Sequence, residues 1–327
     1  MRSLRLVKRK CIAPNILLID GIARSGKFLL GKIVSHFKRI EYFQYSPMLD
    51  QIPVLWKTRV FEHRSAVAYL QLVIDNFVYN RIIGRNLNLR EADHSSIDRS
   101  LERSAYLDRA KNPDVKKMLS QFYSKKRVPS LVVHGMLPLI EPYFEAFAGL
   151  KIIHTRRHPV DLVHSWNRRR WGVRFFSPDR RSFVPVFQGA RRPLGPWFAF
   201  GWKDAARLSP IDRVIKSILT IAGLEKKKPK TLDPTRKKRI FFTCFEDIIQ
   251  RPDDTVRALS DFLKAKPHPR MKSILRREGC YRRLAVGEGK KKLDEIRKEA
   301  SARYFRSLET ASREYEREWN LESYFDA

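Results

Sequence analysis

A glycine-bounded turn between an apolar run and a helical pattern constrains this chain more than any other feature. The turn reads Gly-Ile-Ala-Arg-Ser-Gly-Lys over residues 21–27 and follows the apolar residues 16–19. Apolar residues at helical spacing come directly after it, so we expect a buried strand, a tight turn and the start of a helix. Backbone N–H groups converge in such a turn, and the helix N-terminus adds partial positive charge. The sequence therefore predicts a cradle for a phosphate-like anion.

The residue after this turn departs from the common phosphate-binding pattern. The spacing G-x-x-x-x-G-K is present, but Phe28 stands where a magnesium-binding serine or threonine is usual. We therefore interpret the turn as the site of a nucleotide that is handled without a metal ion.

Apolar runs alternate with helical patterns along the rest of the chain. Further buried strands are expected at residues 130–134, 151–154 and 240–242. Strands separated by helices form parallel sheets that are covered on both faces. The predicted fold class is therefore α/β, with a central parallel sheet flanked by helices. Because no Gly/Ser-rich or Pro-rich linker interrupts residues 1–327, we expect a single domain.

Three segments differ from this alternation. Residues 168–202 are rich in Arg, Trp, Phe, Pro and Gly and show no clean period, which predicts an inserted ordered loop or lid. Residues 226–239 are rich in lysine and are expected to form a solvated surface loop. Residues 288–320 carry apolar residues at helical spacing among many charges, so we expect one charged C-terminal helix.

The composition narrows the choice of partners and compartment. With 67 Lys and Arg against 35 Asp and Glu, the net charge is +32, which favours an anionic partner. These cations are spread over the whole chain rather than grouped in one arm, so nucleic acid is not the expected partner. We expect no transmembrane segment, because the chain has no long uncharged apolar run. The three cysteines show neither disulfide nor zinc spacing, which fits a cytoplasmic protein.

Two more motifs follow predicted strands. Arg157 and Ser165 lie eight residues apart, with a helix expected to begin between them. An arginine at a strand end and a serine two turns into the next helix can hold one dianion from two sides. Residues 245–248 read Phe-Glu-Asp-Ile and combine an acidic turn with a helix start. Each of these motifs alone is equally compatible with a purely structural role.

In this order, the three motifs resemble those of sulfotransferases that use 3′-phosphoadenosine 5′-phosphosulfate. The resemblance implies the P-loop-like sulfotransferase fold, no metal, and Arg157 and Ser165 on the 3′-phosphate of the donor. It also implies that a loop holds the 5′-phosphosulfate, here formed by Ala23, Arg24, Ser25, Gly26, Lys27 and Phe28. The sequence departs from the family at Lys27 and Phe28, where Thr-Thr is usual. Leu29 replaces the tryptophan that many members place against adenine, so the residue that stacks on adenine is not identified.

The resemblance also assigns a general base. In cytosolic members this base is a histidine at a strand end, shortly before Leu-Pro. His134 ends a predicted strand, precedes Leu-Pro at 137–138, and lies 23 residues before Arg157. Its ordinary pKa near neutrality suits proton transfer. Three other histidines are fallback candidates, namely His154, His158 and His164.

The implied reaction transfers a sulfuryl group to an acceptor hydroxyl or amine that His134 deprotonates. Arg24 and Lys27 would stabilise the negative charge that builds on the 5′-phosphate. Residues 168–202 would form the acceptor side, and their mixture of arginine and aromatic residues favours an acidic carbohydrate or another anionic acceptor.

Alternative functions stay open at this stage. A phosphate-loop kinase would place Lys27 on the β- and γ-phosphates, but it needs a metal-binding hydroxyl where Phe28 stands. A non-catalytic nucleic-acid-binding protein would explain the charge without using Arg24, His134, Arg157 and Ser165 as a set. A degenerate sulfotransferase that binds nucleotide without turnover would keep the motifs.

Overall fold

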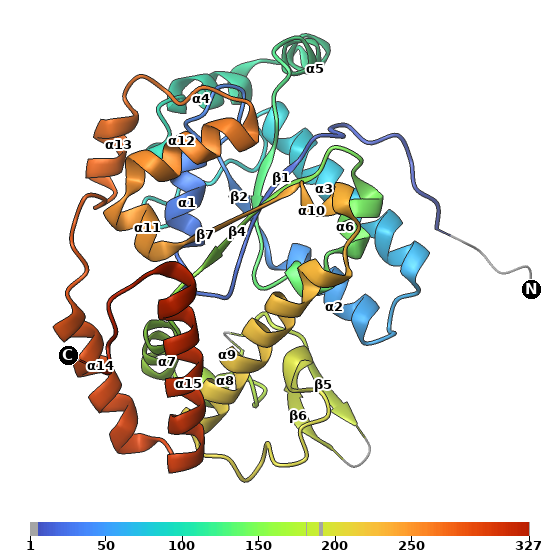
Figure 1. The fold of residues 1–327 in the computed structure, drawn as a ribbon. Coiled ribbons are helices and arrows are strands. Elements are labelled where there is room, and N and C mark those ends of the chain that lie inside the picture. Colours follow the sequence, from blue (N-terminus) through green and yellow to red (C-terminus); the bar gives the residue numbers. More distant parts are fainter. Residues whose placement is uncertain (1–5, 181, 190–191, 327) are drawn as a thin grey trace, which may run out of the picture.

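A central sheet of five parallel strands organises the molecule (Figure 1). The computed structural model describes residues 6–180, 182–189 and 192–326. In spatial order the strands are β2 (Gln44–Tyr45), β3 (Ser130–Val132), β1 (Leu17–Asp20), β4 (Lys151–Arg156) and β7 (Ile240–Cys244). All four neighbouring pairs run parallel. The expected α/β class, with a parallel sheet flanked by helices, is confirmed.

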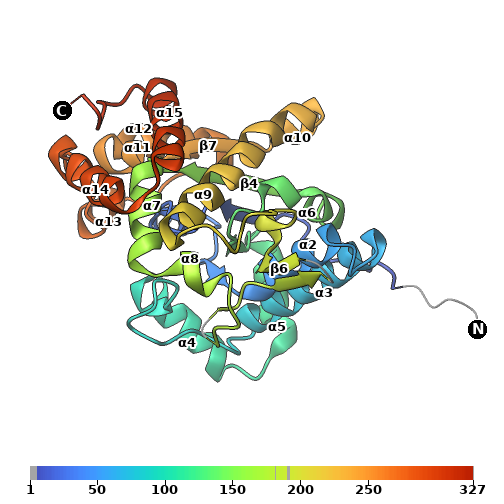
Figure 2. The ribbon, with the colours of Figure 1, turned by 90° about the horizontal axis from the view of Figure 1, so that it is seen from below.

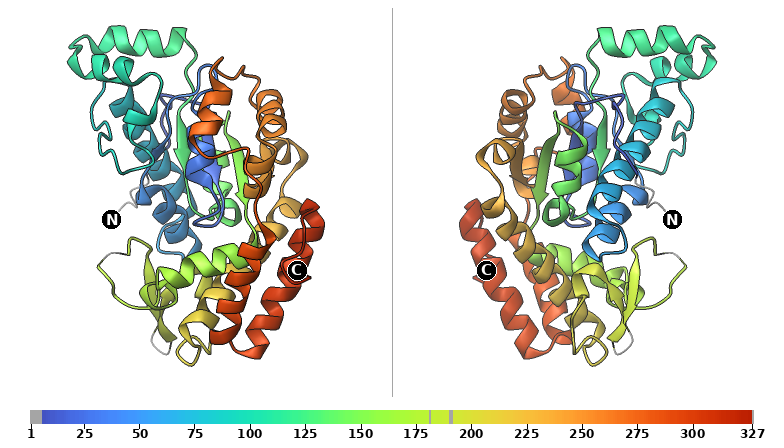
Figure 3. Two further views of the ribbon diagram at one scale, coloured as in Figure 1. Left: turned by 90° about the vertical axis from the view of Figure 1, so that its left-hand side faces the viewer. Right: turned by 90° about the vertical axis from the view of Figure 1, so that its right-hand side faces the viewer.

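Helices cover both faces of this sheet, as the side views show (Figure 3). Alternate residues of a strand point to opposite faces. Leu18, Leu131 and Ile152 therefore share one core, which is covered by α2 (Pro47–Lys57), α3 (His63–Ile82), α5 (Val115–Ser124) and α6 (Glu141–Ala146). Leu17 and Ile153 belong to the opposite core, which is covered by α1 (Lys27–Val34), α4 (Arg103–Lys111), α11 (Phe245–Gln250), α12 (Pro252–Leu263) and α13 (Met271–Arg277).

A third apolar core lies beyond the carboxyl ends of the strands, at the bottom of Figure 1 and facing the viewer in Figure 2. Val163, Ile215 and Leu308 are buried in it. Its helices are α7 (Pro159–Arg168), α8 (Trp171–Arg174), α9 (Pro210–Lys227), α14 (Val286–Glu299) and α15 (Ala302–Trp319). None of the helices in the described residues combines the length and the hydropathy that a membrane span requires.

The inserted segment 168–202 is more regular than a loop. It contains α8 and an antiparallel hairpin formed by β5 (Val186–Gly189) and β6 (Arg192–Pro196). Residues 181, 190 and 191 of this segment lie outside the described part. The sequence gives little warning of the hairpin, because its strands show no alternation of apolar and polar residues.

The expectation of a solvated loop at 226–239 is wrong. Helix α9 continues to Lys227, because Ile221 and Glu225 face the interior while the lysines of its last turn face solvent. The short helix α10 (Pro234–Lys237) follows. The Asp233 side chain caps it by accepting the N–H of Arg236 at 2.9 Å.

The expectation of a single helix over 288–320 is also wrong, because α14 and α15 are separate. Ala300 and Ser301 have extended ψ angles of 143° and 149°. The N–H of Ser301 donates to the buried Asp212 carboxylate at 3.0 Å. Since this amide is anchored to α9, the chain turns at Ser301, and both helices pack their apolar faces on the third core.

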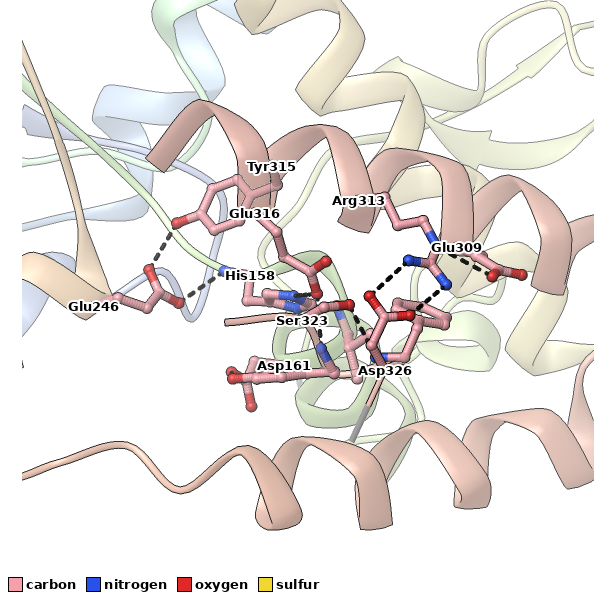
Figure 4. Close-up of polar contacts among 12 residues, drawn as sticks. His158, Asp161, Glu246, Glu309, Arg313, Tyr315, Glu316, Ser323 and Asp326 are labelled. Atoms are coloured by element: carbon pink, nitrogen blue, oxygen red, sulfur yellow. Dashed lines mark hydrogen bonds and ion pairs between the residues drawn. The ribbon is translucent and has the colours of Figure 1, made fainter. Parts of the chain in front are cut away.

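The C-terminal helix α15 is tied to the strand ends by buried polar contacts (Figure 4). The Tyr315 hydroxyl donates to Glu246 at 2.7 Å, and the N–H of His158 donates to the same carboxylate at 3.0 Å. The ring of His158 contacts Glu316 at 3.0 Å. Burial raises the pKa of Glu246, and its hydrogen bonds from Tyr315 and His158 oppose that shift. Helix α15 thus fixes the residues that flank Arg157.

Tyr315→Phe should destabilise the fold at neutral pH. Leaving a buried carboxylate oxygen without its donor costs about 1–3 kcal/mol. The lost hydrogen bond also raises the pKa of Glu246 further, so the cost should shrink as the pH falls towards 5 and the carboxyl takes up a proton. Urea denaturation at both pH values measures this.

Tyr281→Phe is the matched control, because its exposed hydroxyl donates to Asp253 at 2.7 Å. We expect this surface change to stay within about 0.5 kcal/mol. Equal losses of stability in the two variants would contradict the role given to Tyr315.

Candidate functional site

The residues singled out from the sequence converge at one edge of the sheet. The glycine turn follows β1, His134 follows β3, and Arg157 follows β4. Since the strands are parallel, their carboxyl ends meet at this edge, where ligands of open α/β sheets bind. The candidate site is therefore built from loops on a rigid sheet.

Two glycines allow the neighbouring strands to approach the loop after β1. Gly21 has φ 144°, and a Cβ there would lie 2.1 Å from the Thr155 carbonyl oxygen. Gly26 has φ 94°, and a Cβ there would lie 2.5 Å from the ring of Phe245. Gly26 is also the N-cap residue that directly precedes α1. The loop is thus held between β4 and α11, with the N-terminus of α1 at its end.

Lys27 is buried on the inner side of this loop. Its ammonium donates to the carbonyl oxygen of Ile22 at 2.8 Å. Burial lowers the pKa of Lys27 to about 8, against the opposing effect of Asp20 and Asp50. Lys27 is therefore a cation at neutral pH whose remaining donors can serve an anion in the loop.

The residues expected to bind one dianion are neighbours. The Nε of Arg24 donates to the Ser165 hydroxyl at 3.3 Å, and Arg157 donates to the Arg24 carbonyl oxygen at 3.1 Å. Arg169, which sequence reasoning missed, also donates to the Ser165 hydroxyl at 3.1 Å. Its signal was its place one helical turn after Ser165.

These three arginines concentrate positive charge beside the loop. Burial lowers the pKa of Arg24, and the nearby Arg169 and Arg157 lower it further. The Arg157 guanidinium lies 4.2 Å from the centre of the Phe245 ring, and the Asp161 carboxylate lies 3.9 Å from the same guanidinium. Two buried polar atoms nearby, the Arg157 Nε and the Ser25 hydroxyl, have no hydrogen-bond partner among the described residues. Such a site suits a ligand with phosphate groups.

His134 forms a pair with Asp50, on the side of the loop away from Arg157. The N–H of His134 donates to Asp50 at 2.8 Å, and its Nδ1 is 3.1 Å from the other carboxylate oxygen. Burial and Lys27 lower the pKa of His134, while Asp50 opposes this. The ring is therefore neutral at pH 7, with Nδ1–H directed to Asp50 and Nε2 left as an acceptor. This is the arrangement of a general base.

An apolar cavity of about 260 Å³ adjoins His134 and the loop. The inserted segment supplies much of its wall, including Trp171, Phe175, Phe183, Trp197 and Phe198. Trp166 joins this wall to the loop, because its indole N–H donates to the Ala23 carbonyl oxygen at 2.9 Å. The one arginine of the described lining, Arg174, pairs with Asp179 at 3.1 Å. The cavity is thus suited to an apolar molecule that presents a polar group to His134.

Phe28 packs among the aromatic rings beside His134. Its ring centre lies 5.8 Å from Phe43, 5.6 Å from Tyr45 and 6.0 Å from His134. The residue after Lys27 therefore has an aromatic packing role, and it brings no hydroxyl to the loop.

The fallback histidines have other partners. His154 is buried between Asp20, at 3.1 Å, and Glu225, at 3.4 Å. Burial opposes its protonation, but the two carboxylates raise the pKa of His154 to about 9. These three side chains are close enough to hold a metal ion, yet the raised pKa describes a cation between two anions. His158 and His164 contact Glu316 and Glu295. None of the three lines the apolar cavity.

Comparison with known proteins finds likeness only among solved structures. No family model and no curated protein matches the chain. The sulfotransferase domain from the curacin biosynthetic pathway is 14% identical over 79% of this chain and 76% of that chain, with a TM-score of 0.45. The sulfotransferase from Alicyclobacillus acidocaldarius is 15% identical over 89% and 98%, with a TM-score of 0.39. Retinol dehydratase in complex with androsterone and the inactive cofactor PAP is 14% identical over 94% and 80%, with a TM-score of 0.31.

The ring of His134 should titrate below the ordinary pKa of histidine. Asp50→Asn should lower the pKa further, because the carboxylate stabilises the protonated ring. Nuclear magnetic resonance of ring-labelled histidine measures both values. Asp75→Asn is the matched control, since Asp75 accepts the N–H of Ile12 instead. A pKa that rises in Asp50→Asn would contradict the assigned pair.

Proposed function

We propose that this chain is a sulfotransferase that moves a sulfuryl group from 3′-phosphoadenosine 5′-phosphosulfate to a hydroxyl group of an acceptor. The observation that carries the proposal is the neutral His134 ring, paired with the Asp50 carboxylate, between an apolar cavity and a cationic phosphate-type loop. A base, an acceptor space and an anion cradle are the parts that this reaction needs, and here they adjoin one another.

The donor would lie with its 5′-phosphosulfate in the loop and its 3′-phosphate between Arg157 and Ser165. The buried atoms without partners, Arg157 Nε and Ser25 Oγ, support a ligand that accepts hydrogen bonds at this place. Arg169 would add a further cation to the 3′-phosphate, because it already shares the Ser165 hydroxyl with Arg24.

In the proposed reaction, Nε2 of His134 accepts the proton of the acceptor hydroxyl. The acceptor oxygen forms a bond to sulfur while the bond from sulfur to the 5′-phosphate oxygen breaks. Adenosine 3′,5′-bisphosphate is the second product. Arg24, Lys27 and the N–H groups of the loop would stabilise the charge on the leaving phosphate. Asp50 would hold the imidazole in the required tautomer.

The acceptor that the cavity favours is an apolar or aromatic alcohol. Its walls are mainly aromatic, and the Arg174 charge is balanced by Asp179. This differs from the anionic carbohydrate suggested by the composition of residues 168–202. The arginines of that segment and of the end of α7 contribute little to the described lining of the apolar cavity. They therefore give this cavity no preference for an anionic acceptor.

Adenosine 3′,5′-bisphosphate should raise the melting temperature without magnesium. At a ligand concentration 100 times Kd, linkage adds about 2.7 kcal/mol to the free energy of unfolding. Arg157→Gln and Ser165→Ala should lose most of this gain. Arg168→Gln is the control, because this exposed arginine lies on the same helix as Ser165.

Two outcomes of this titration would contradict the proposal. Stabilisation by Mg²⁺-ATP alone would favour the kinase alternative. An equal loss in Arg157→Gln and Arg168→Gln would mean that net charge, rather than a built site, attracts the ligand.

His134→Ala should lower kcat for sulfation of 2-naphthol by about 10²–10⁴-fold while leaving the affinity for adenosine 3′,5′-bisphosphate unchanged. Transfer of radiolabelled sulfate measures the rate. His63→Ala is the control, because this half-exposed histidine pairs with Glu145 and does not line the apolar cavity. A kcat that survives in His134→Ala would place the base elsewhere.

A further inference from the structure

A second cavity lies at the end of the sheet opposite to the candidate site. Its volume is about 400 Å³, and it is lined by residues that precede the strands, among them Ala13, Val128 and Gly149, and by Lys151, the first residue of β4. The glycine loop follows the last residue of β1. The length of the strands therefore separates this cavity from the loop.

Basic residues line the cavity, and most of them have no carboxylate partner among the described residues. Four basic residues contribute to its wall, namely Arg39, Lys126, Arg127 and Lys151. Arg127 pairs with Glu102 at 2.9 Å and with Glu41 at 3.6 Å. For the other three, no ion pair is found within residues 6–180, 182–189 and 192–326.

Two of these cations are held in place by the end of α12. Lys151 Nζ donates to the Phe262 carbonyl oxygen at 2.5 Å, and Arg39 donates to that of Lys264 at 3.2 Å. Each keeps further N–H donors, since an ammonium has three and a guanidinium five. They are thus fixed in position and still able to bind a ligand.

The helix end alone does not balance this charge. A helix C-terminus carries about half a negative elementary charge, whereas Arg39, Lys151 and Lys264 bring three positive charges to it. Burial lowers the pKa of Lys151, and Lys264 and Arg39 lower it further, with no carboxylate among the causes. The local repulsion would be relieved by an anion in the cavity.

We propose that this cavity binds a small organic anion, a phosphate or sulfate ester with an apolar body, at a site separate from the loop. The apolar part would lie on the floor, which includes Leu17, Ile40, Phe122 and Leu263. The acid group would lie at Arg39 and Lys151. The volume is in the range of small-molecule sites.

Calorimetric titration with phenyl phosphate tests the proposal. All proteins in the test carry Arg24→Gln and Arg157→Gln, which disable the loop. This background protein should bind one phenyl phosphate. Adding Arg39→Gln and Lys151→Gln should weaken the binding by about tenfold or more, because two charge-assisted hydrogen bonds are lost. Adding Lys237→Gln and Lys238→Gln instead changes the net charge equally, at the exposed C-terminal end of α10, and should leave Kd unchanged.

Absence of binding in the background protein would overturn the proposal. So would equal weakening by the two added pairs, since it would assign the binding to net charge. Melting temperatures check that each variant folds. If the Arg39–Lys151 variant does not fold, Lys126→Gln at the exposed rim replaces it, with an expected weakening of about threefold, and unchanged binding there overturns the proposal.

Discussion

The close approach of Thr155 to Gly21 is the constraint on which the candidate site depends. The Thr155 carbonyl oxygen occupies the place where a side chain of residue 21 would begin. Because β1 and β4 are adjacent and parallel, this fit brings the loop after β1 against the residues after β4. Arg157 can then donate to the Arg24 carbonyl oxygen, and Arg24 can reach Ser165. A larger residue at 21 would separate Arg24 from Arg157 and Ser165.

Buried charge links the loop after β1 to His134. Asp20 and Asp50 both favour the charged form of Lys27, and Lys27 in turn disfavours protonation of His134. Asp50 therefore acts on two groups, since it compensates Lys27 and also orients the imidazole. Asp20 is shared as well, because it accepts the N–H groups of Met136 and Leu137, which follow His134 in the chain. The backbone after β3 is thus positioned by a carboxylate at the end of β1.

Local patterns in the sequence predict the parts of this arrangement that depend on local physics. Four strands of the parallel sheet are apolar runs, and glycine stands at two of the three positive-φ positions of the turn, Gly21 and Gly26, so both features could be predicted from the sequence. The contact of Asp50 with His134 could not be predicted from the sequence, because the two residues are 84 positions apart. The break between α14 and α15 could not be predicted for the same reason. It depends on the N–H of Ser301, which is bound by Asp212, a residue 89 positions earlier. Pairings of this kind are set by the tertiary fold.

The net charge of +32 favours anionic partners in general, but it does not indicate which acceptor the apolar cavity favours. At the loop, burial lowers the pKa of Arg24 and the neighbouring Arg169 and Arg157 lower it further, so an anion would relieve the repulsion among these arginines. In the apolar cavity, by contrast, the arginine of the lining is neutralised by Asp179 and the rest of the wall is largely aromatic. An anionic acceptor would gain little there, and it would also be close to the negative charge of Asp50. The two sides of His134 therefore favour opposite chemistry, with anions held at the loop and an uncharged apolar molecule held in the cavity.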